Sequence, residues 1–339
     1  MRIWMLPKYN VTNKYNELLS SSLEKKGVDV FHLLKKDILK IKKNDIVHIH
    51  WPHSLYQSDY KLIFILKSLL LLNFFFYLKT KKVKLVWTIH NLYPHKIKYP
   101  KLEKWIRQLI INQMDLLFAN GHLLREIILK HYKINEQKLK VSLHGVYEGV
   151  YKRQGLDCRE KYGIPKGKFV YLFFGTINKY KGLENLIRNF KKIQDEESIL
   201  LIVGKLSDDS FHLKKEIEEA ENIISDFRFI PDDEIGDIIY SADLVVLPFK
   251  EITTSGSAIL ALTFKKNLLA PNSPFINEYF GKLAKTYESN HEDSLYNALI
   301  TAKDQQNDFK EELFNQKLAE LNWDNITEEM LKEYGHIKN

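Results

Sequence analysis

Short apolar runs alternate with longer amphipathic stretches through the first 150 residues. The runs are typical of strands, and they lie at residues 2–6, 28–33, 46–51, 83–90, 116–121 and 140–144. Between them, apolar residues recur at spacings of three and four, as in residues 13–27, where Asn13 is a candidate helix cap and Gly27 a candidate stop. Strands that alternate with helices predict an α/β fold with parallel sheets.

The same alternation begins again in the second half of the chain. Strands are expected at residues 169–175, 199–204, 227–230, 244–249 and 267–271. Helices are expected at 183–193, then up to about residue 225, near 232–241, and after the segment TTSGS at 253–257. Residues 150–167 are rich in charge and glycine and interrupt the periodicity, so they are the expected joint between two Rossmann-like domains.

One apolar segment, LIFILKSLLLLNFFFYL at residues 62–78, is long enough to raise the question of a membrane span. It is interrupted by Lys67 and Asn73 and flanked by lysines. A spanning helix needs about 20 mostly apolar residues. We therefore favour a buried or interfacial helix over a span.

The composition is that of a globular protein, with 339 residues, 45% hydrophobic and 28% charged. The single cysteine, Cys158, excludes a disulfide framework or a cysteine-based zinc site and fits a reducing compartment. The start, MRIWMLPKYN, is too short for a secretory signal and is broken at Pro7, so none is expected. The sequence has neither G-x-G-x-x-G nor a P-loop, which disfavours a dehydrogenase or a P-loop NTPase.

Charge is unevenly distributed around the net value of +8. Residues 1–150 contain 26 Lys and Arg against 11 Asp and Glu, whereas residues 151–339 contain 25 against 32. A basic first half predicts an anionic partner, and nucleic acid, an anionic membrane surface and a phosphorylated acceptor all fit. A solvated lysine-rich face is the simpler explanation for part of the excess.

Ligands of parallel sheets bind beyond the carboxyl ends of the strands, so the residues that follow each strand are the candidates for a site. Histidines occupy three of these positions, namely His50, His90 and His144. His90 is a candidate general base or hydrogen-bond donor because imidazole titrates near neutral pH. His48, His50 and His53 lie close together in sequence, but no carboxylate accompanies them, so no metal site is expected.

Two strand-to-helix turns in the second half suit an anion. GTINKYKGLENLI at residues 175–187 combines glycine with Lys179 and Lys181, which can neutralise a diphosphate as point charges. TTSGS at residues 253–257 precedes an apolar helix, where it is either a simple N-cap or an anion site at the helix N-terminus. Two such turns in one domain favour a nucleotide-linked diphosphate as the ligand.

These segments, taken in order, resemble the GT-B glycosyltransferases, especially family 4 and its relatives in polysaccharide assembly. The resemblance runs over nearly the whole chain. It rests on the segments NKYNELLSSSLEKKGVDV, DIVHIHWPH, VWTIHNLYPH, VSLHGVYEGVY, FFGTINKYKGLENLI, SADLVVLPFKEITTSGSAILAL and LNWDNITEEMLKEY. It implies two Rossmann-like domains facing each other across a cleft, with an acceptor-binding domain at 1–152, a nucleotide-sugar-binding domain at 165–312 and a helical segment at 313–339 that crosses back to the first domain.

Site residues follow from the resemblance by position. Lys181 matches the lysine on the donor diphosphate, His90 the histidine near the transferred sugar, and Glu251 the first glutamate of the E-x7-E signature, so His90 and Glu251 are the expected catalytic residues. The expected donor-binding residues are Gly175, Thr176, Asn178, Lys179, Lys181, Gly204, Thr254, Ser255, Gly256 and Ser257. The expected acceptor-binding residues are Asn13, His50, Trp51, His95 and His144.

The sequence departs from the family pattern at two places. Thr176 stands where the family has the arginine of its Gly-Arg turn, and Lys179 nearby lacks the bidentate fork of arginine. The second glutamate of the signature is missing, because the matching positions are Ile259 and Leu260. These departures leave both retention and inversion of stereochemistry open.

The resemblance implies a metal-independent glycosyltransferase that moves a sugar from a UDP- or GDP-sugar to a glycan or lipid-linked acceptor in cell-surface polysaccharide synthesis, without a further cofactor. The expected location is the cytoplasm, with peripheral association at the inner face of the membrane as an additional hypothesis. A sugar-nucleotide epimerase or hydrolase of the same architecture is the first alternative. A basic nucleic-acid-binding protein is the second, although the sequence carries no recognised nucleic-acid motif.

Overall fold

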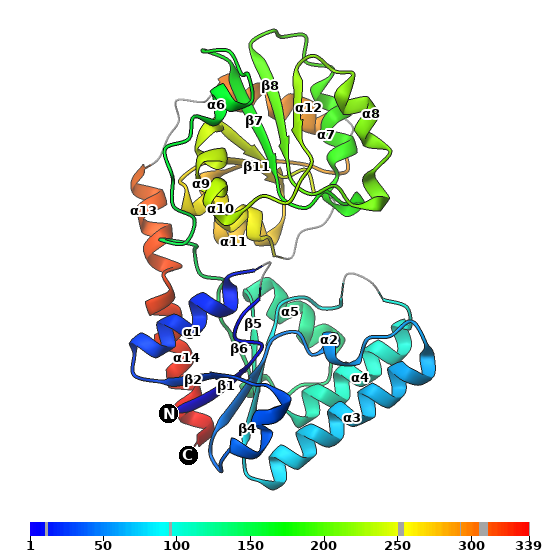
Figure 1. Cartoon of the computed structure of the whole chain (residues 1–339), viewed down its shortest axis with the longest axis vertical. Coiled ribbons are helices and arrows are strands. Elements are labelled where there is room, and N and C mark those ends of the chain that lie inside the picture. Colours follow the sequence, from blue (N-terminus) through cyan, green and yellow to red (C-terminus); the bar gives the residue numbers. More distant parts are fainter. Residues whose placement is uncertain (11–12, 95–96, 250–253, 292, 305–310, 339) are drawn as a thin grey trace. The chain divides into compact units, whose positions relative to one another are not determined.

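The structure is a computed structural model that describes residues 1–10, 13–94, 97–249, 254–291, 293–304 and 311–338. It divides into two compact units (Figure 1). Unit 1 comprises Met1–Gly145 together with Leu321–Asn339, and unit 2 comprises Val146–Glu320. Each unit is built on a six-stranded parallel sheet with helices, so the predicted α/β class is confirmed. The division falls at residue 145, a few residues before the expected joint at 150–167.

The sheet of unit 1 has the strand order β2-β1-β3-β4-β5-β6. Its strands are β1 (Arg2–Leu6), β2 (Asp29–His32), β3 (Ile46–Ile49), β4 (Lys84–Ile89), β5 (Leu116–Ala119) and β6 (Leu139–Val141). All neighbouring strands are parallel, so their carboxyl ends share one edge of the sheet. The order reverses at β1, which lies between β2 and β3, and that edge is where a doubly wound sheet binds ligands.

Helices cover both faces of this sheet. One face packs against α3 (Lys61–Thr80), α4 (Pro100–Gln113) and α5 (His122–His131). The other packs against α1 (Tyr15–Lys25) and the C-terminal helix α14 (Trp323–Lys338), which lie side by side (Figure 1). The hydroxyls of Ser22 and Thr327 are 2.9 Å apart, and Tyr334 reaches into the core of unit 1, where its hydroxyl lies 2.8 Å from His48 Nδ1.

The ends of α1 lie close to the sequence signals. The N-cap is Lys14, without a side-chain capping bond, so the cap expected at Asn13 is one residue early; the Asn13 side chain instead accepts a hydrogen bond of 2.8 Å from the backbone N–H of Tyr15. After the helix, Gly27 has a φ of +78°, and its N–H donates to the carbonyl of Glu24. The left-handed conformation suits glycine and closes the helix.

Helix α3 packs through one face only. Its buried residues are Phe64, Ser68, Leu71, Phe75 and Leu78, which recur every three or four positions. Within the described part of the chain, α3 is the one helix that is long and apolar enough to cross a membrane by length and composition. Only 28% of its most apolar window is buried, so much of this helix faces outward from unit 1.

Unit 2 has the strand order β12-β11-β10-β7-β8-β9. Its strands are β7 (Phe169–Phe174), β8 (Ser198–Val203), β9 (Ile223–Asp226), β10 (Leu244–Val246), β11 (Asn267–Pro271) and β12 (Ala284–Tyr287). Its helices are α6 (Cys158–Lys161), α7 (Leu183–Phe190), α8 (Leu213–Glu218), α9 (Asp232–Ser241), α10 (Gly256–Thr263), α11 (Pro274–Tyr279), α12 (Ser294–Asp304) and α13 (Glu311–Glu320).

One predicted strand of unit 2 is wrong and another was not predicted. Residues 227–230 are not a strand; the strand is β9, four residues earlier, where a helix was expected to end. Phe229 is 59% exposed, and Arg228 turns to the carboxylates of Asp226 and Glu234, which takes this segment out of the sheet. β12, with the sequence AKTY, is an edge strand whose half-exposed residues give little apolar signal.

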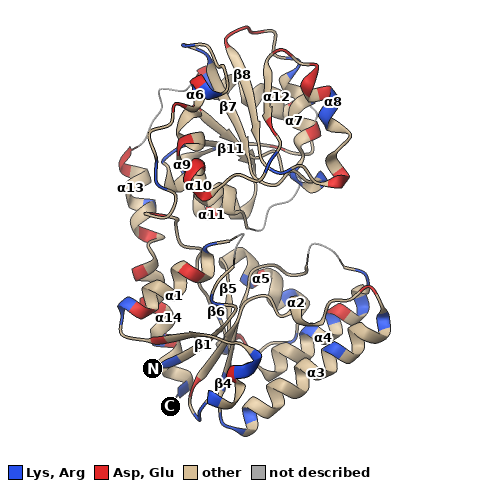
Figure 2. Ribbon diagram, viewed as in Figure 1, with Lys and Arg blue, Asp and Glu red and all other residues tan. Residues whose placement is uncertain are grey.

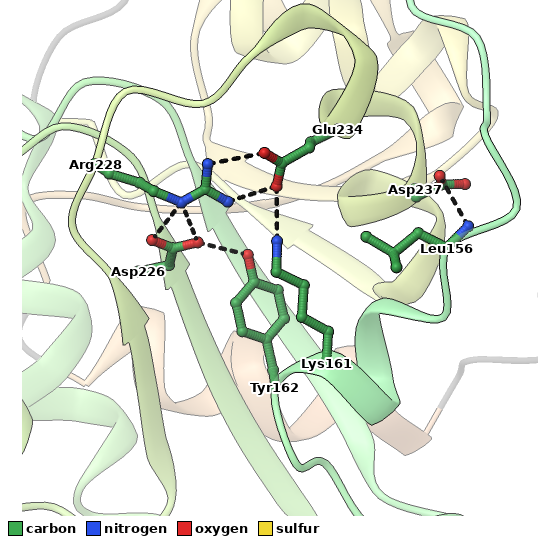
Figure 3. Close-up of polar contacts among 7 residues, drawn as sticks. All are labelled: Leu156, Lys161, Tyr162, Asp226, Arg228, Glu234 and Asp237. Atoms are coloured by element: carbon green, nitrogen blue, oxygen red, sulfur yellow. Dashed lines mark hydrogen bonds and ion pairs between the residues drawn. The ribbon is translucent and has the colours of Figure 1, made fainter.

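A network of charges holds the segment that enters unit 2 (Figure 3). Arg228 bridges Asp226 and Glu234, Lys161 donates to Glu234 at 2.7 Å, and Tyr162 donates to Asp226 at 2.8 Å. Beside it, the buried carboxylate of Asp237 on α9 accepts backbone N–H groups of residues 154–156 at 2.9 to 3.3 Å. These bonds lower the pKa of Asp237 against the opposing effect of burial.

Candidate functional site

The strand order of unit 2 reverses at β7, which lies between β8 and β10. The loops after β7 and β8 are joined by backbone hydrogen bonds, because Ile177 N donates to Lys205 O at 2.8 Å and Ser207 N donates to Ile177 O at 2.9 Å. Gly204 lies against the backbone at the end of β7, where a Cβ on it would be 2.1 Å from Gly175 O. The two loops therefore form one layer over the carboxyl edge of the sheet.

The loop after β7 is brought close to the end of β10 by Gly182. Its φ is +70°, and a Cβ at this position would lie 2.0 Å from the carbonyl oxygen of Pro248. Only glycine fits so close an approach without a shift of the backbone. The preceding residue, Lys181, is thereby buried at the point where the strand order reverses.

Lys181 is 9% exposed, and its ammonium lies beside Gly175, 3.2 Å from the place that a Cβ of that glycine would take. Ser257 Oγ is 2.9 Å from the same Cβ position of Gly175. Among the described residues, no carboxylate forms an ion pair with Lys181, and its ammonium lies 5.5 Å from the centroid of the Phe249 ring. Burial lowers the pKa of Lys181 from its ordinary 10.5 to about 8. A buried cation without a counter-charge is a binding site for an anion.

The N-terminus of α10 lies at the same place. Ser255 is its N-cap and accepts the N–H of Ala258 at 3.2 Å, so the capping function of this serine is confirmed. The N–H groups of Gly256 and Ser257 in the first turn have no partner within the helix by its geometry. Together with Lys181, they provide donors and positive potential for one anion.

The other predicted donor-binding residues are spread along these turns. Thr176 and Lys179 are exposed, and Thr254 is half-buried just before the cap of α10. Asn178 carries a buried side-chain oxygen with no hydrogen-bond partner among the described residues. Glu251 of the catalytic prediction and His95 of the acceptor prediction lie outside the described residues.

In unit 1, the residues that follow β3, β4 and β5 form a hydrogen-bonded chain. His50 Nδ1 lies 3.1 Å from His90 Nε2, and His90 Nδ1 lies 2.8 Å from the Asn120 side-chain nitrogen. The Tyr15 hydroxyl, from the first turn of α1, donates to Asn120 Oδ1 over a long 3.4 Å. All four side chains are buried.

This chain fixes the protonation of its members. When Asn120 accepts from Tyr15, its amide nitrogen donates to His90 Nδ1, so the proton of His90 is on Nε2 and points to His50. The proton of His50 is then on Nε2, which has no partner among the described residues. Burial, with smaller effects from the neighbouring histidines, holds the pKa values of His50 and His90 well below 6.5, so both rings are neutral near pH 7.

Two further predicted acceptor-binding residues, Trp51 and His144, lie beside this chain. The Trp51 ring stacks on His90 with centroids 4.6 Å apart and planes at 19°. His144 lies edge-on to Tyr15 at 4.9 Å, and its Nδ1 is 2.7 Å from Gly145 O. Burial lowers the pKa of His144 to about 4. Asn13, the other predicted acceptor-binding residue that the structure describes, directly precedes the N-cap of α1.

His48, by contrast, is a structural residue. Its ring nitrogens lie 2.7 Å from Thr88 Oγ1 and 2.8 Å from the Tyr334 hydroxyl, and the ring is fully buried. Within the part of the chain that the structure describes, no group of three His, Cys, Asp or Glu side chains is arranged to hold a metal ion.

Sequence reasoning missed two members of the chain, Asn120 and Tyr15. Asn120 directly follows β5, so it is a candidate by the same rule as His90, namely that ligands bind at the residues that follow parallel strands (the strand-end rule). It was missed because the strand was expected to extend to residue 121 and so included Asn120. Tyr15 was predicted only as part of the helix at residues 13–27. It is the first residue of that helix, and its hydroxyl reaches Asn120 at the end of β5.

Two family models match the chain. "Glycosyl transferases group 1" matches residues 157–318, and "Glycosyltransferase Family 4" matches residues 14–148. Among curated proteins, a GDP-mannose:glycolipid 4-beta-D-mannosyltransferase of Xanthomonas campestris pv. campestris is 24% identical over 262 residues, which cover 77% of this chain and 70% of that protein.

Solved structures share the fold. Sucrose-phosphate synthase from Thermosynechococcus elongatus superimposes with a TM-score of 0.74 at 13% identity and covers 99% of each chain. Alr3699/HepE from Anabaena, solved in complex with UDP and glucose, superimposes with a TM-score of 0.69 at 14% identity and covers 99% of this chain and 100% of that one.

Proposed function

This chain belongs to the GT-B glycosyltransferases of the family 4 type, and from that premise we propose that unit 2 binds the nucleotide-diphosphate sugar while unit 1 presents the acceptor. The observation that carries the donor assignment is Lys181, a buried ammonium without a counter-charge among the described residues, next to the first turn of α10. The diphosphate of the donor supplies the missing negative charge.

The chemistry of the proposed site follows from the charges of the reaction. Negative charge develops on the departing nucleoside diphosphate, and positive charge develops on the sugar. Lys181 and the N–H groups of Gly256 and Ser257 stabilise the departing diphosphate without reorganisation, because they are fixed in place before the reaction. Lys179, exposed on the same loop, adds a second positive charge. We propose that this set acts without a metal ion and without a further cofactor.

His90 is the proposed contact to the transferred sugar. Its ring is neutral near pH 7, and both of its nitrogens are engaged, by Asn120 and by His50. Substrate therefore replaces His50 at His90 Nε2, an exchange between neutral hydrogen bonds that costs little. In a retaining reaction the Nε2–H of His90 donates to the donor sugar. In an inverting reaction the His90 proton must first be on Nδ1, with the Asn120 side chain flipped to accept it, so that Nε2 can take the proton of the acceptor hydroxyl. The anomeric configuration of the product distinguishes these uses. Glu251 remains a proposed catalytic residue on the resemblance alone.

We propose a glycan or lipid-linked acceptor. The acceptor-binding set is Asn13, His50, Trp51, His95 and His144. His50 Nε2 is a buried donor that lacks a protein partner among the described residues, and an acceptor hydroxyl or a bound water satisfies it. The Xanthomonas relative, by its name, uses GDP-mannose and a glycolipid, which supports a GDP-sugar donor and a lipid-linked acceptor in cell-surface polysaccharide synthesis. The proposed location is the cytoplasm, at the inner face of the membrane.

Release of nucleoside diphosphate tests this proposal. The purified protein is incubated with GDP-mannose, UDP-glucose or ADP-glucose, with and without short-chain glycolipid acceptors. We expect one donor to release its diphosphate only when an acceptor is present, and we expect EDTA to leave the rate unchanged. Release without any acceptor would identify a hydrolase. Conversion of the donor sugar without release would identify an epimerase. Loss of activity in EDTA that Mg²⁺ or Mn²⁺ restores would refute metal independence.

A further inference from the structure

The outward face of α3 is mostly apolar and is interrupted by the exposed side chains of Lys67 and Asn73. Its exposed apolar positions recur at helical spacing and so lie toward one side of the helix. They are Leu62 (81% exposed), Ile63 (42%), Leu66 (58%), Leu69 (46%), Leu70 (61%), Phe76 (62%) and Tyr77 (37%). We call these seven residues the α3 face. A contiguous exposed patch of this kind marks an interaction surface.

The opposite side of α3 is held in the core of unit 1. Phe64, Leu71, Phe75 and Leu78 pack there among the side chains of β3, β4 and α4. The helix is followed at once by Lys84–Ile89, a strand in the middle of the sheet. A helix fixed in this way cannot cross a bilayer while unit 1 is folded. It can lie in the plane of a membrane surface, with the α3 face toward the lipid.

The charges around the α3 face are mostly positive, although Lys79 pairs with Asp115 at 3.8 Å and Lys98 pairs with Asp59 at 3.4 Å. Between Asp59 and Glu103 the sequence contains nine lysines and no acidic residue. Lysines lie at both ends of α3 and along the exposed side of α4 (Figure 2). Helix α4, which packs beside α3, also exposes Trp105 (55%). Apolar side chains bordered by lysines and by tryptophan or tyrosine match the interface of an anionic bilayer.

We propose that the α3 face docks on a bilayer of anionic phospholipids, with α3 lying in the plane of the membrane. This inference rests on the proposed function, because it gives the enzyme direct access to a lipid-linked acceptor. A second copy of the chain fits the surface less well, since a two-fold dimer through the α3 face would bring the same lysines of both copies together. A lipid headgroup layer neutralises them instead.

Co-sedimentation with vesicles tests the docking surface. The full chain is mixed with vesicles of phosphatidylcholine alone or with 30% phosphatidylglycerol. We expect binding to the anionic vesicles that weakens in high salt. Leu66→Asp combined with Leu70→Asp introduces charge at two exposed positions one turn apart, so it should lower the partition coefficient at least tenfold. Lys81→Glu combined with Lys82→Glu should lower it on the order of tenfold on anionic vesicles only.

Phe211→Asp is the matched control, because Phe211 is similarly exposed (63%) but belongs to unit 2. It should leave vesicle binding unchanged. Equal loss in the control, or no loss in the Leu66/Leu70 variant, would overturn the proposal. The proposal would also be overturned if the parent protein bound no vesicles but formed a dimer in sedimentation velocity, and the Leu66/Leu70 variant were monomeric. Vesicle-bound protein that resists extraction by alkaline carbonate would indicate a true span and would overturn it as well.

Donor binding separates this inference from the function on which it rests. The α3 variants should keep the thermal shift that the nucleotide sugar gives the parent protein, because α3 and the donor site lie in different units. Vesicle binding that is absent while donor binding persists overturns the docking surface alone. Donor binding that is absent while vesicle binding persists overturns the proposed function and leaves the surface.

Discussion

Replacing Lys181 by methionine should stabilise the free protein and abolish donor binding at the same time. The ammonium is buried without a counter-charge among the described residues, and its pKa is lowered from 10.5 to about 8. Each unit of pKa difference corresponds to 1.36 kcal/mol, so carrying this charge at pH 7 costs the folded state roughly 3 kcal/mol. Methionine has a similar length, keeps the contact with Phe249 and carries no charge.

The sign of the pH dependence is fixed by the two pKa values. Below about pH 8 the lysine is charged in both the folded and the unfolded state, and the full cost is present. Between pH 8 and 10.5 only the unfolded state keeps the proton, so the cost decreases, and above 10.5 it is gone. The advantage of Lys181→Met should therefore be largest at pH 7 and much smaller at pH 9.5.

Thermal unfolding with and without nucleotide sugar measures both effects. For a unit of this size, a gain of about 3 kcal/mol raises the melting temperature by roughly 6–12 °C. Donor at a hundred times its Kd stabilises the parent by about 2.7 kcal/mol, and this shift should vanish in Lys181→Met. A variant that melts lower than the parent at pH 7, or that keeps the donor shift, would refute the reasoning.

Lys266→Met is the matched control within unit 2. Burial also lowers the pKa of Lys266 to about 8, but its ammonium donates to the carbonyls of Tyr240 and Ala242 at 2.8 and 2.7 Å. Methionine here leaves two carbonyl groups without that donor, which offsets the gain from removing the charge. This variant should not melt higher than the parent, and it should keep the donor shift.

Three further substitutions test the framework around the sites. Asp237→Asn should lose roughly 1–3 kcal/mol of unfolding free energy at pH 7 in urea titrations. Because the pKa of Asp237 is lowered in the folded state, its carboxylate stabilises the parent above pH 4, and this stabilisation is lost as the pH falls through the folded pKa. The difference in stability between parent and variant should therefore shrink in acid. Tyr334→Phe should cost about 1–3 kcal/mol in the same assay by leaving His48 Nδ1 unpaired, and an unchanged urea midpoint would contradict that assignment. Gly182→Ala should weaken donor binding in calorimetry at least tenfold because its Cβ meets backbone, whereas Gly163→Ala, with a similar φ of +63° and open space, should lose only stability.

The fold was predictable from the sequence where strands are buried on both faces. β1 and β11 were placed to the residue, because continuous apolar runs mark central parallel strands. β9 was misplaced because Ser225 and Asp226 resemble turn residues, while the neighbouring FRFI imitates a strand. The pairing of β9 with β8 depends on a partner strand that local sequence does not report.

The candidate site was predictable as far as the strand-end rule extends. That rule found His50, His90 and Gly175, which the structure places at the carboxyl edges of the two sheets. The burial of Lys181 could not be foreseen, because it depends on the approach of Gly182 to Pro248, 66 positions later in the chain. The bond between His50 and His90 likewise arises only when β3 and β4 pair.

The location of the donor diphosphate is the central claim, and a crystal structure of the protein soaked with UDP or GDP tests it most directly. We predict density for the diphosphate within hydrogen-bonding distance of Lys181 Nζ and of the first backbone amides of α10. Nucleotide bound at any other place, with the Lys181 ammonium left without a phosphate oxygen, would contradict it.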